Sequence, residues 1–170
     1  MSATAPRKIT LERTFQAAID EVWAMWTTKD GIESWWGPDG FAVEVRQLNL
    51  RPGGLLLYAM TAVAAPQIAF MKNAGMPLTT ESRITFDQVV APRRLAYTHA
   101  ADFIPGVERY DVAMLVELRA DGKAVHMTMT FDAMHDEHWT QMAVMGWESE
   151  LEKLRARLAR QGGTRPRGRG

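Results

Sequence analysis

The sequence predicts a single α+β domain in which a curved, seven-stranded antiparallel sheet wraps around one long C-terminal helix, with two short helices after the first strand. Alternation of apolar and polar residues indicates the strands, which we expect at 8–15, 41–50, 55–62, 81–90, 94–100, 109–119 and 125–131. From Asp136 to about Arg160 the period becomes helical, and Trp147 and Leu151 fall on one apolar stripe. That stripe requires burial against the sheet.

The two short helices are indicated by their boundaries. Asp20 precedes a first helix at 21–26, and a second follows from Thr28 to Trp36. Gly37-Pro38 then stops helical continuation. Short links, such as the Asp121-Gly122 hairpin signal, join the later strands, so the last six strands should form an antiparallel meander.

The segment 63–79 interrupts the meander and is expected to be an insertion. Pro66 and Gly75 bracket a short helix, with proline in its first turn and glycine just beyond its end. Its apolar residues Ile68, Phe70 and Met71 exceed what a solvated loop needs. We therefore expect this segment to act as a lid.

Composition excludes several classes of function. The 170 residues are 46% apolar, enough for one sizeable core, and 20 basic side chains balance 20 acidic ones. This neutral body predicts no nucleic-acid partner, and no run of about 20 apolar residues predicts membrane insertion. The absence of cysteine excludes thiolate chemistry, and with no signal peptide the expected location is the cytoplasm.

We expect one domain at 7–160, between a disordered N-terminus at 1–6 and a disordered basic tail at 161–170.

Four motifs in this order resemble a known family: Trp35-Trp36-Gly37-Pro38, Arg51-Pro52-Gly53-Gly54, residues 94–98 (RLAYT), and Gly146-Trp147 followed by Leu151 and Leu154. Over residues 7–160 the chain resembles bacterial homologues of the C-terminal domain of the heat-shock-protein ATPase activator, within the SRPBCC (START-like, helix-grip) superfamily. The resemblance implies a deep cavity between sheet and long helix that takes apolar molecules. It also suggests a stress-response setting, although nothing here corresponds to the N-terminal domain of the eukaryotic activator.

Strand parity and helix face nominate residues to line that cavity. Successive turns of a meander alternate between the two ends of a sheet, so segments 63–79 and 101–108 and the start of the long helix should meet at one end and form the mouth. The predicted ligand-binding residues are Trp36, Phe41, Val43, Phe70, Met71, Tyr97, His99, Phe103, Tyr110, Val112, Met114, Met127, Met129, Trp139 and Met142. For each of them the competing interpretation is ordinary core packing, or a surface position for Tyr97 and His99. Trp147 is assigned to the core.

The sequence predicts no metal site and no cofactor. His135 and His138 could share a helix face, but Asp136 is better explained as the N-cap of the long helix, and a third ligand is lacking. No serine has a nucleophile-elbow context, and there is no phosphate-binding loop.

Three functions follow from this sequence. The first is binding of a small apolar or aromatic molecule. The second is a small cyclase or hydrolase, in which Tyr97, His99 or Tyr110 does acid–base work. The third is an interaction module for a chaperone or another protein. We favour binding over catalysis, because a cavity needs only contacts whereas catalysis needs aligned groups. A homodimer is compatible with the sequence.

Overall fold

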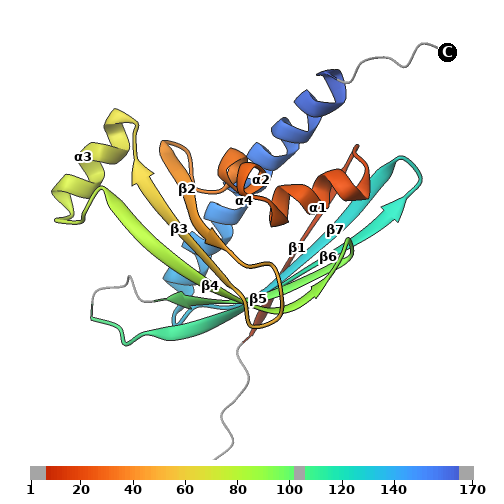
Figure 1. Ribbon diagram of the computed structural model, residues 1–170. Helices are drawn as coiled ribbons and strands as arrows, with labels where there is room; N and C mark the ends of the chain where they lie inside the picture. Colours follow the sequence, from red (N-terminus) through yellow and green to blue (C-terminus); the bar gives the residue numbers. More distant parts are fainter. Residues whose placement is uncertain (1–6, 102–105, 165–170) are drawn as a thin grey trace, which may run out of the picture.

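The computed structural model describes residues 7–101 and 106–164. Its elements follow one another as β1 (Lys8–Phe15), α1 (Ile19–Thr27), α2 (Lys29–Trp35), β2 (Phe41–Leu48), β3 (Leu55–Ala62), α3 (Ala65–Asn73), β4 (Thr79–Val90), β5 (Arg94–Ala101), β6 (Tyr110–Asp121), β7 (Ala124–Asp132) and α4 (Glu137–Thr164) (Figure 1). This order confirms the predicted α+β arrangement. Phe103 and the two ends of the chain lie outside the described residues.

The strands form one antiparallel sheet in the order β1-β7-β6-β5-β4-β3-β2. The six consecutive strands β2 to β7 make the predicted meander, and β1 pairs with β7 from Lys8 opposite Asp132 to Phe15 opposite Val125. The register shifts at Val45/Gln47 and at Phe86/Gln88. Such irregularities bend a strand and increase its twist, which helps this sheet to curve around α4.

Helix α4 crosses the concave side of the sheet (Figure 1). Asp136 caps it as predicted: its Oδ1 accepts a hydrogen bond from the Trp139 amide at 2.8 Å. The helix ends at Thr164, beyond the expected end near Arg160. The expected end was placed before Gly162-Gly163, but a glycine costs a helix only about 1 kcal/mol and does not forbid it.

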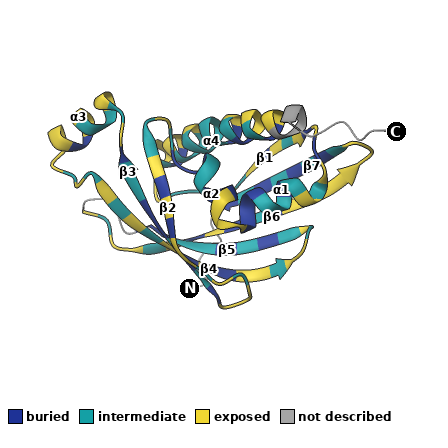
Figure 2. Cartoon of the chain, turned by 45° about the horizontal axis from the view of Figure 1, so that its top comes forward, coloured by how far each residue is buried: buried dark blue, intermediate teal, exposed yellow. Residues whose placement is uncertain are grey.

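The core lies between α4, α1, α2 and the concave face of the sheet, where the buried residues gather (Figure 2). Leu151 and Leu154 are completely buried, as predicted. Trp147 was expected to be core, but it is only partly buried. It stacks on Trp26 with ring centroids 6.1 Å apart on one side and borders an internal space on the other.

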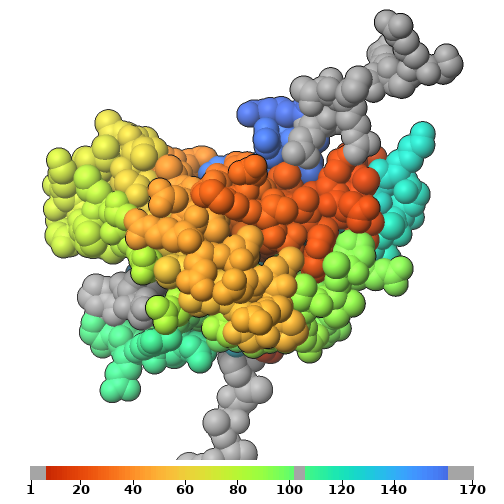
Figure 3. Space-filling model, viewed as in Figure 1, coloured from red at the N-terminus to blue at the C-terminus, as the bar shows by residue number. Residues whose placement is uncertain are grey.

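Helix α3 connects the end of β3 to the start of β4 and projects at one side of the molecule (Figure 1). Figure 3 shows this side as a bulge that is continuous with the rest of the surface. Its start is held by Gly40, whose carbonyl accepts hydrogen bonds from the amides of Val63 and Ala64. Gly40 has a φ of +86°, and a Cβ there would come within 2.3 Å of the Gln67 side chain. The base of α3 is therefore fixed to the loop before β2.

No helix within the described ranges is long and apolar enough to cross a membrane.

Candidate functional site

A cavity of about 370 Å³ lies between the first half of α4 and the concave face of the sheet. Its walls come from the loop before β2, from strands β2 to β7 and from α3 and α4. The lining residues are Trp36, Gly37, Pro38, Phe41, Tyr58, Met60, Met71, Met76, Thr80, Glu81, Ser82, Ile84, Tyr97, His99, Ala101, Val112, Met114, Phe131, Met134, Ala143, Gly146, Trp147 and Glu150. Most of this surface is apolar, with the polar groups concentrated on a few side chains.

Helix α4 presents a row of four residues to the cavity: Ala143, Gly146, Trp147 and Glu150. Their spacing of three and four residues places them on one helical face. Gly146 leaves the most room, because a Cβ built there would meet no atom within 4 Å. Glycine in a helix interior costs about 1 kcal/mol relative to alanine, so the open space comes at the expense of helix stability.

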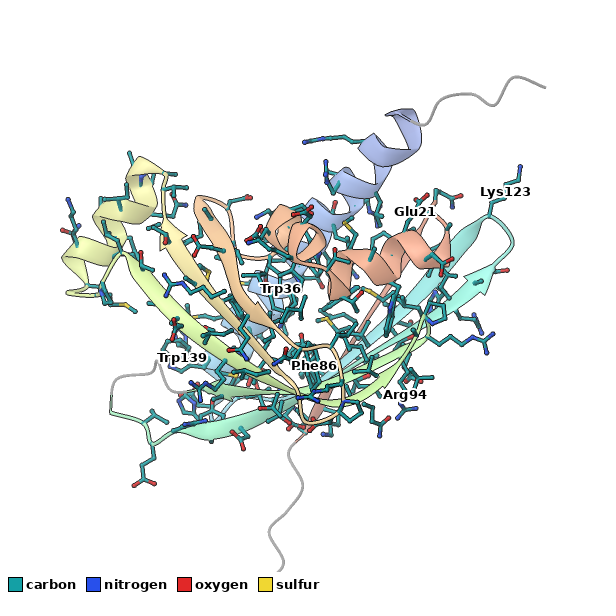
Figure 4. The ribbon with its side chains drawn as sticks, in the orientation of Figure 1. Glu21, Trp36, Phe86, Arg94, Lys123 and Trp139 are labelled. Carbon is teal, nitrogen blue, oxygen red and sulfur yellow. The ribbon has the colours of Figure 1, made fainter. Side chains whose placement is uncertain are left out.

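Four aromatic residues, Trp36, Tyr58, Tyr97 and Trp147, line the cavity together with Glu150. The Trp36 ring lies 5.3 Å from the Tyr58 ring and 6.4 Å from the Trp147 ring, nearly perpendicular to both. The Tyr97 ring lies 6.4 Å from Trp36. Figure 4 shows Trp36 in the interior, between α4 and the sheet.

Glu150 is the acidic group at the centre of this wall. Burial raises the pKa of its carboxyl to about 7, against a hydrogen bond from Gly37 and the positive charge of Lys153, both of which lower it. Its Oε1 accepts a hydrogen bond from the Gly37 amide at 2.6 Å, and Lys153 donates to the Gly37 carbonyl at 2.7 Å. The two α4 side chains therefore hold both sides of Gly37, whose φ is +88°.

Two tyrosines face the same region from β3 and β5. Burial raises the pKa of the Tyr58 hydroxyl, despite a hydrogen bond to Ser82, and raises that of Tyr97 further, with the charges of Tyr58 and Glu150 adding to the effect. Both hydroxyls therefore remain neutral hydrogen-bonding groups near pH 7. Within the described residues, neither the Tyr97 hydroxyl nor Trp36 Nε1 has a hydrogen-bond partner, and both are buried.

Seven predicted site residues meet at this cavity: Trp36, Phe41, Met71, Tyr97, His99, Val112 and Met114. Their strand parity and the position of the mouth were sufficient to nominate them. Met71 comes from α3 and is 6% exposed, so one side chain of the predicted lid does close over the cavity.

Several other predicted residues do not line the cavity. Met127 and Met129 are fully buried on β7 and belong to the packed core. Val43 is in the core near Gly37. Phe70 and Met142 are 65% and 47% exposed, because each lies beside the inward-facing residue of its helix rather than on the inward face.

Tyr110 and Trp139 also lie outside the lining. The Tyr110 hydroxyl is 2.9 Å from His135 Nδ1 and accepts a hydrogen bond from the His135 amide, which holds it at the start of α4. The Trp139 ring packs beside His135 at the same end (Figure 4). Phe103 lies outside the described residues.

Sequence reasoning missed Tyr58, Ser82 and Glu150. Glu150 carried a readable signal: it lies three residues after Trp147 and one before Leu151, inside the apolar stripe where a solvated carboxylate is out of place. Tyr58 lies in a strand that is apolar on both faces, so alternation could not assign its direction.

The His135 region does not assemble a metal site. His135 Nε2 lies 3.3 Å from Asp136 Oδ2. The described part of the chain holds no group of three or more His, Cys, Asp or Glu side chains arranged to bind a metal.

The long helix held by a curved antiparallel sheet, with a cavity between them, defines a helix-grip protein of the SRPBCC type. Residues 16–159 match the family described as "Activator of Hsp90 ATPase homolog 1-like protein", and the chain belongs to this family. A comparison with curated protein sequences found no match.

Solved structures share the whole architecture. A protein from Chromobacterium violaceum superposes with a TM-score of 0.74 at 20% identity, covering 89% of this chain and 96% of its own. An AHSA1-like protein from Aeromonas hydrophila gives 0.70 at 21% identity, covering 96% and 99%. The AHSA1 protein from Silicibacter pomeroyi gives 0.70 at 20%, covering 91% and 99%. Identities this low show the fold alone.

Proposed function

We propose that this protein binds a small apolar or aromatic molecule in the cavity between α4 and the sheet. The observation that carries the proposal is the cavity itself: about 370 Å³ of mostly apolar space inside an otherwise well-packed domain. Protein interiors are normally close-packed, and pockets of about 300–1,000 Å³ with a few convergent polar groups are typical of small-molecule sites.

Gly146 supports the same conclusion. An alanine at this position would meet no neighbour within 4 Å and would favour the helix, yet the chain has glycine, which keeps the space open. A domain selected only for stability gains nothing from such a residue. The cavity also favours ligand binding over the protein-interaction module, because docking on a partner's surface does not require an internal space.

The Gly146 side of the cavity gives a direct test. We expect 1-naphthalenemethanol, a neutral aromatic probe, to bind with 1:1 stoichiometry in isothermal titration calorimetry. Gly146→Leu should weaken that binding by about tenfold or more, because the added side chain occupies the same space. Gly146→Ala, which adds one methyl group, should have a smaller effect.

Two results would contradict the proposal. One is a wild-type protein that shows no saturable binding of this probe and that, when purified from its own host, retains no small molecule in native mass spectrometry. The other is probe binding that Gly146→Leu leaves unchanged, which would place the site elsewhere. Circular dichroism of each variant establishes that it is folded.

A further inference from the structure

The ionisable side chains that line the cavity indicate the charge of the molecule that binds there. The ionisable side chains in the lining are Glu81, Glu150, Tyr58, Tyr97 and His99. Among the described lining residues there is no lysine and no arginine. Glu81 already has a counter-charge, since its Oε2 lies 2.8 Å from Arg46 Nη1. Glu150 is therefore the carboxyl group that lacks a matching cation inside this space.

The contacts of Glu150 leave half of its carboxylate unused. Oε1 accepts the Gly37 amide, whereas within the described residues no hydrogen bond reaches Oε2. Lys153, one turn further along α4, donates its hydrogen bond to the Gly37 carbonyl, so its charge lowers the pKa of Glu150 without a direct bond between the two side chains. A charged carboxylate in a buried site is costly unless a cation or hydrogen-bond donor accompanies it.

The surroundings of Glu150 suit a cation better than a neutral donor. Trp36, Tyr58, Tyr97 and Trp147 all border the cavity around it. Aromatic faces attract ammonium groups, most strongly where water is excluded, and tryptophan does so best. A carboxylate set among aromatic rings therefore combines an ion pair with cation–π attraction at one end of an apolar space.

We infer that the molecule bound in this cavity is an amine: an apolar or aromatic body that carries a protonated nitrogen, seated against Glu150 and the rings of Trp36, Tyr58, Tyr97 and Trp147. The inference rests on the proposed function and adds the ligand's charge to it. The body of the molecule fills the space toward Met60, Met71 and Met114, where the lining is apolar.

Three probes of nearly the same shape but different charge test which charge the cavity prefers in a bound molecule. 1-Naphthylmethylamine is a cation, 1-naphthalenemethanol is neutral and 1-naphthoate is an anion. At about pH 8, where a carboxyl with a pKa of about 7 is ionised, we expect the amine to bind about tenfold more tightly than the alcohol. The anion should bind most weakly. Affinities are measured by isothermal titration calorimetry on the full chain.

Glu150→Gln tests the residue. Glutamine keeps an oxygen to accept the Gly37 amide but carries no charge, so the variant should bind amine and alcohol about equally while its affinity for the alcohol stays near that of the wild type. Glu152→Gln is the matched control: Glu152 is on the same helix with a side chain 65% exposed, and it should keep the preference for the amine.

The pH dependence of the wild-type protein gives a second measurement that needs no variant. Between about pH 8 and pH 6 the amine stays protonated while Glu150 gains its proton, so amine affinity should fall several-fold and alcohol affinity should stay level. His99 borders the same cavity and histidines titrate in this range. The fall must therefore disappear in Glu150→Gln, because a fall caused by His99 would remain.

The outcomes separate the two proposals. If the alcohol binds at least as tightly as the amine, or if Glu150→Gln keeps the preference, the inference about charge is wrong and the cavity still binds apolar molecules. If none of the three probes binds the wild-type protein and native mass spectrometry finds no molecule retained from its own host, the proposed function fails and the inference fails with it. A retained molecule without a basic nitrogen would overturn the inference alone.

Discussion

The interior of this domain has two halves with different packing. Under α1 and the second half of α4, the interior is packed with side chains that are at most 2% exposed, such as Phe15, Trp26, Leu154 and Leu158. Under the first half of α4, the same sheet and helix enclose about 370 Å³ of open space. One half therefore supplies most of the close packing, and the other half contains the space in which the proposed ligand would bind.

Leu154→Ala should produce the largest effect, in the packed half. A fully buried leucine leaves a cavity when truncated, so we expect a loss of about 2–5 kcal/mol in the free energy of unfolding. Met114→Ala in the hollow half should cost less than half as much, because Met114 already borders open space and has fewer contacts to lose. Urea denaturation compares the two. Equal losses would show that the halves are energetically alike.

Glu150→Gln should change the free energy of unfolding by an intermediate amount, and it should increase it. Burial raises the pKa of this carboxyl from its usual 4.5 to about 7, so the folded state binds the proton more tightly than the unfolded state. The resulting cost is absent below about pH 4.5, grows as the pH rises and is complete above about pH 7. At about pH 8 we therefore expect the glutamine variant to be about 1–3 kcal/mol more stable than the wild type.

Denaturation curves at several pH values check this expectation. Near pH 5 the advantage of Glu150→Gln should be small, since the wild-type carboxyl is then mostly protonated in the folded state. The exposed Glu152→Gln should stay within about 0.5 kcal/mol of the wild type throughout. An advantage of Glu150→Gln that does not change with pH would contradict the burial of charge as its cause.

The smallest effects on stability should come from α3, the predicted lid. Met71 lines the cavity whereas its neighbour Phe70 is 65% exposed. Met71→Ser should weaken binding of 1-naphthalenemethanol while costing no more than about 1–2 kcal/mol of stability, and Phe70→Ser should change neither quantity appreciably. This pair corrects the original expectation that both side chains cover the mouth.

Hydrogen exchange measures whether α3 moves. Few contacts join α3 to the sheet apart from those at its base, so amides at 66–76 should exchange fast in the free protein and slow down when the probe is bound. Protection equal to that of β5 and β6 without a probe would mean that α3 is a fixed part of the structure.

The sequence by itself determined the strand order, the meander and the long helix with its Asp136 cap. These features follow from local periodicity and from turn length, which act over neighbouring residues. The same periodicity placed Tyr97, Val112 and Met114 on the concave face, where the structure has them lining the cavity, since strand parity fixes the face on which a side chain lies.

Only the tertiary structure decided where the interior is filled and where it is open. Met127 and Met129 have the same parity pattern as Met114, yet they are packed into the core whereas Met114 borders the cavity. Glu150 belongs to the cavity wall because its carboxylate accepts a hydrogen bond from Gly37 and because Trp36 and Tyr97 line the same space. Such contacts join residues that are about 50 to 110 positions apart, and no pattern along the chain records them.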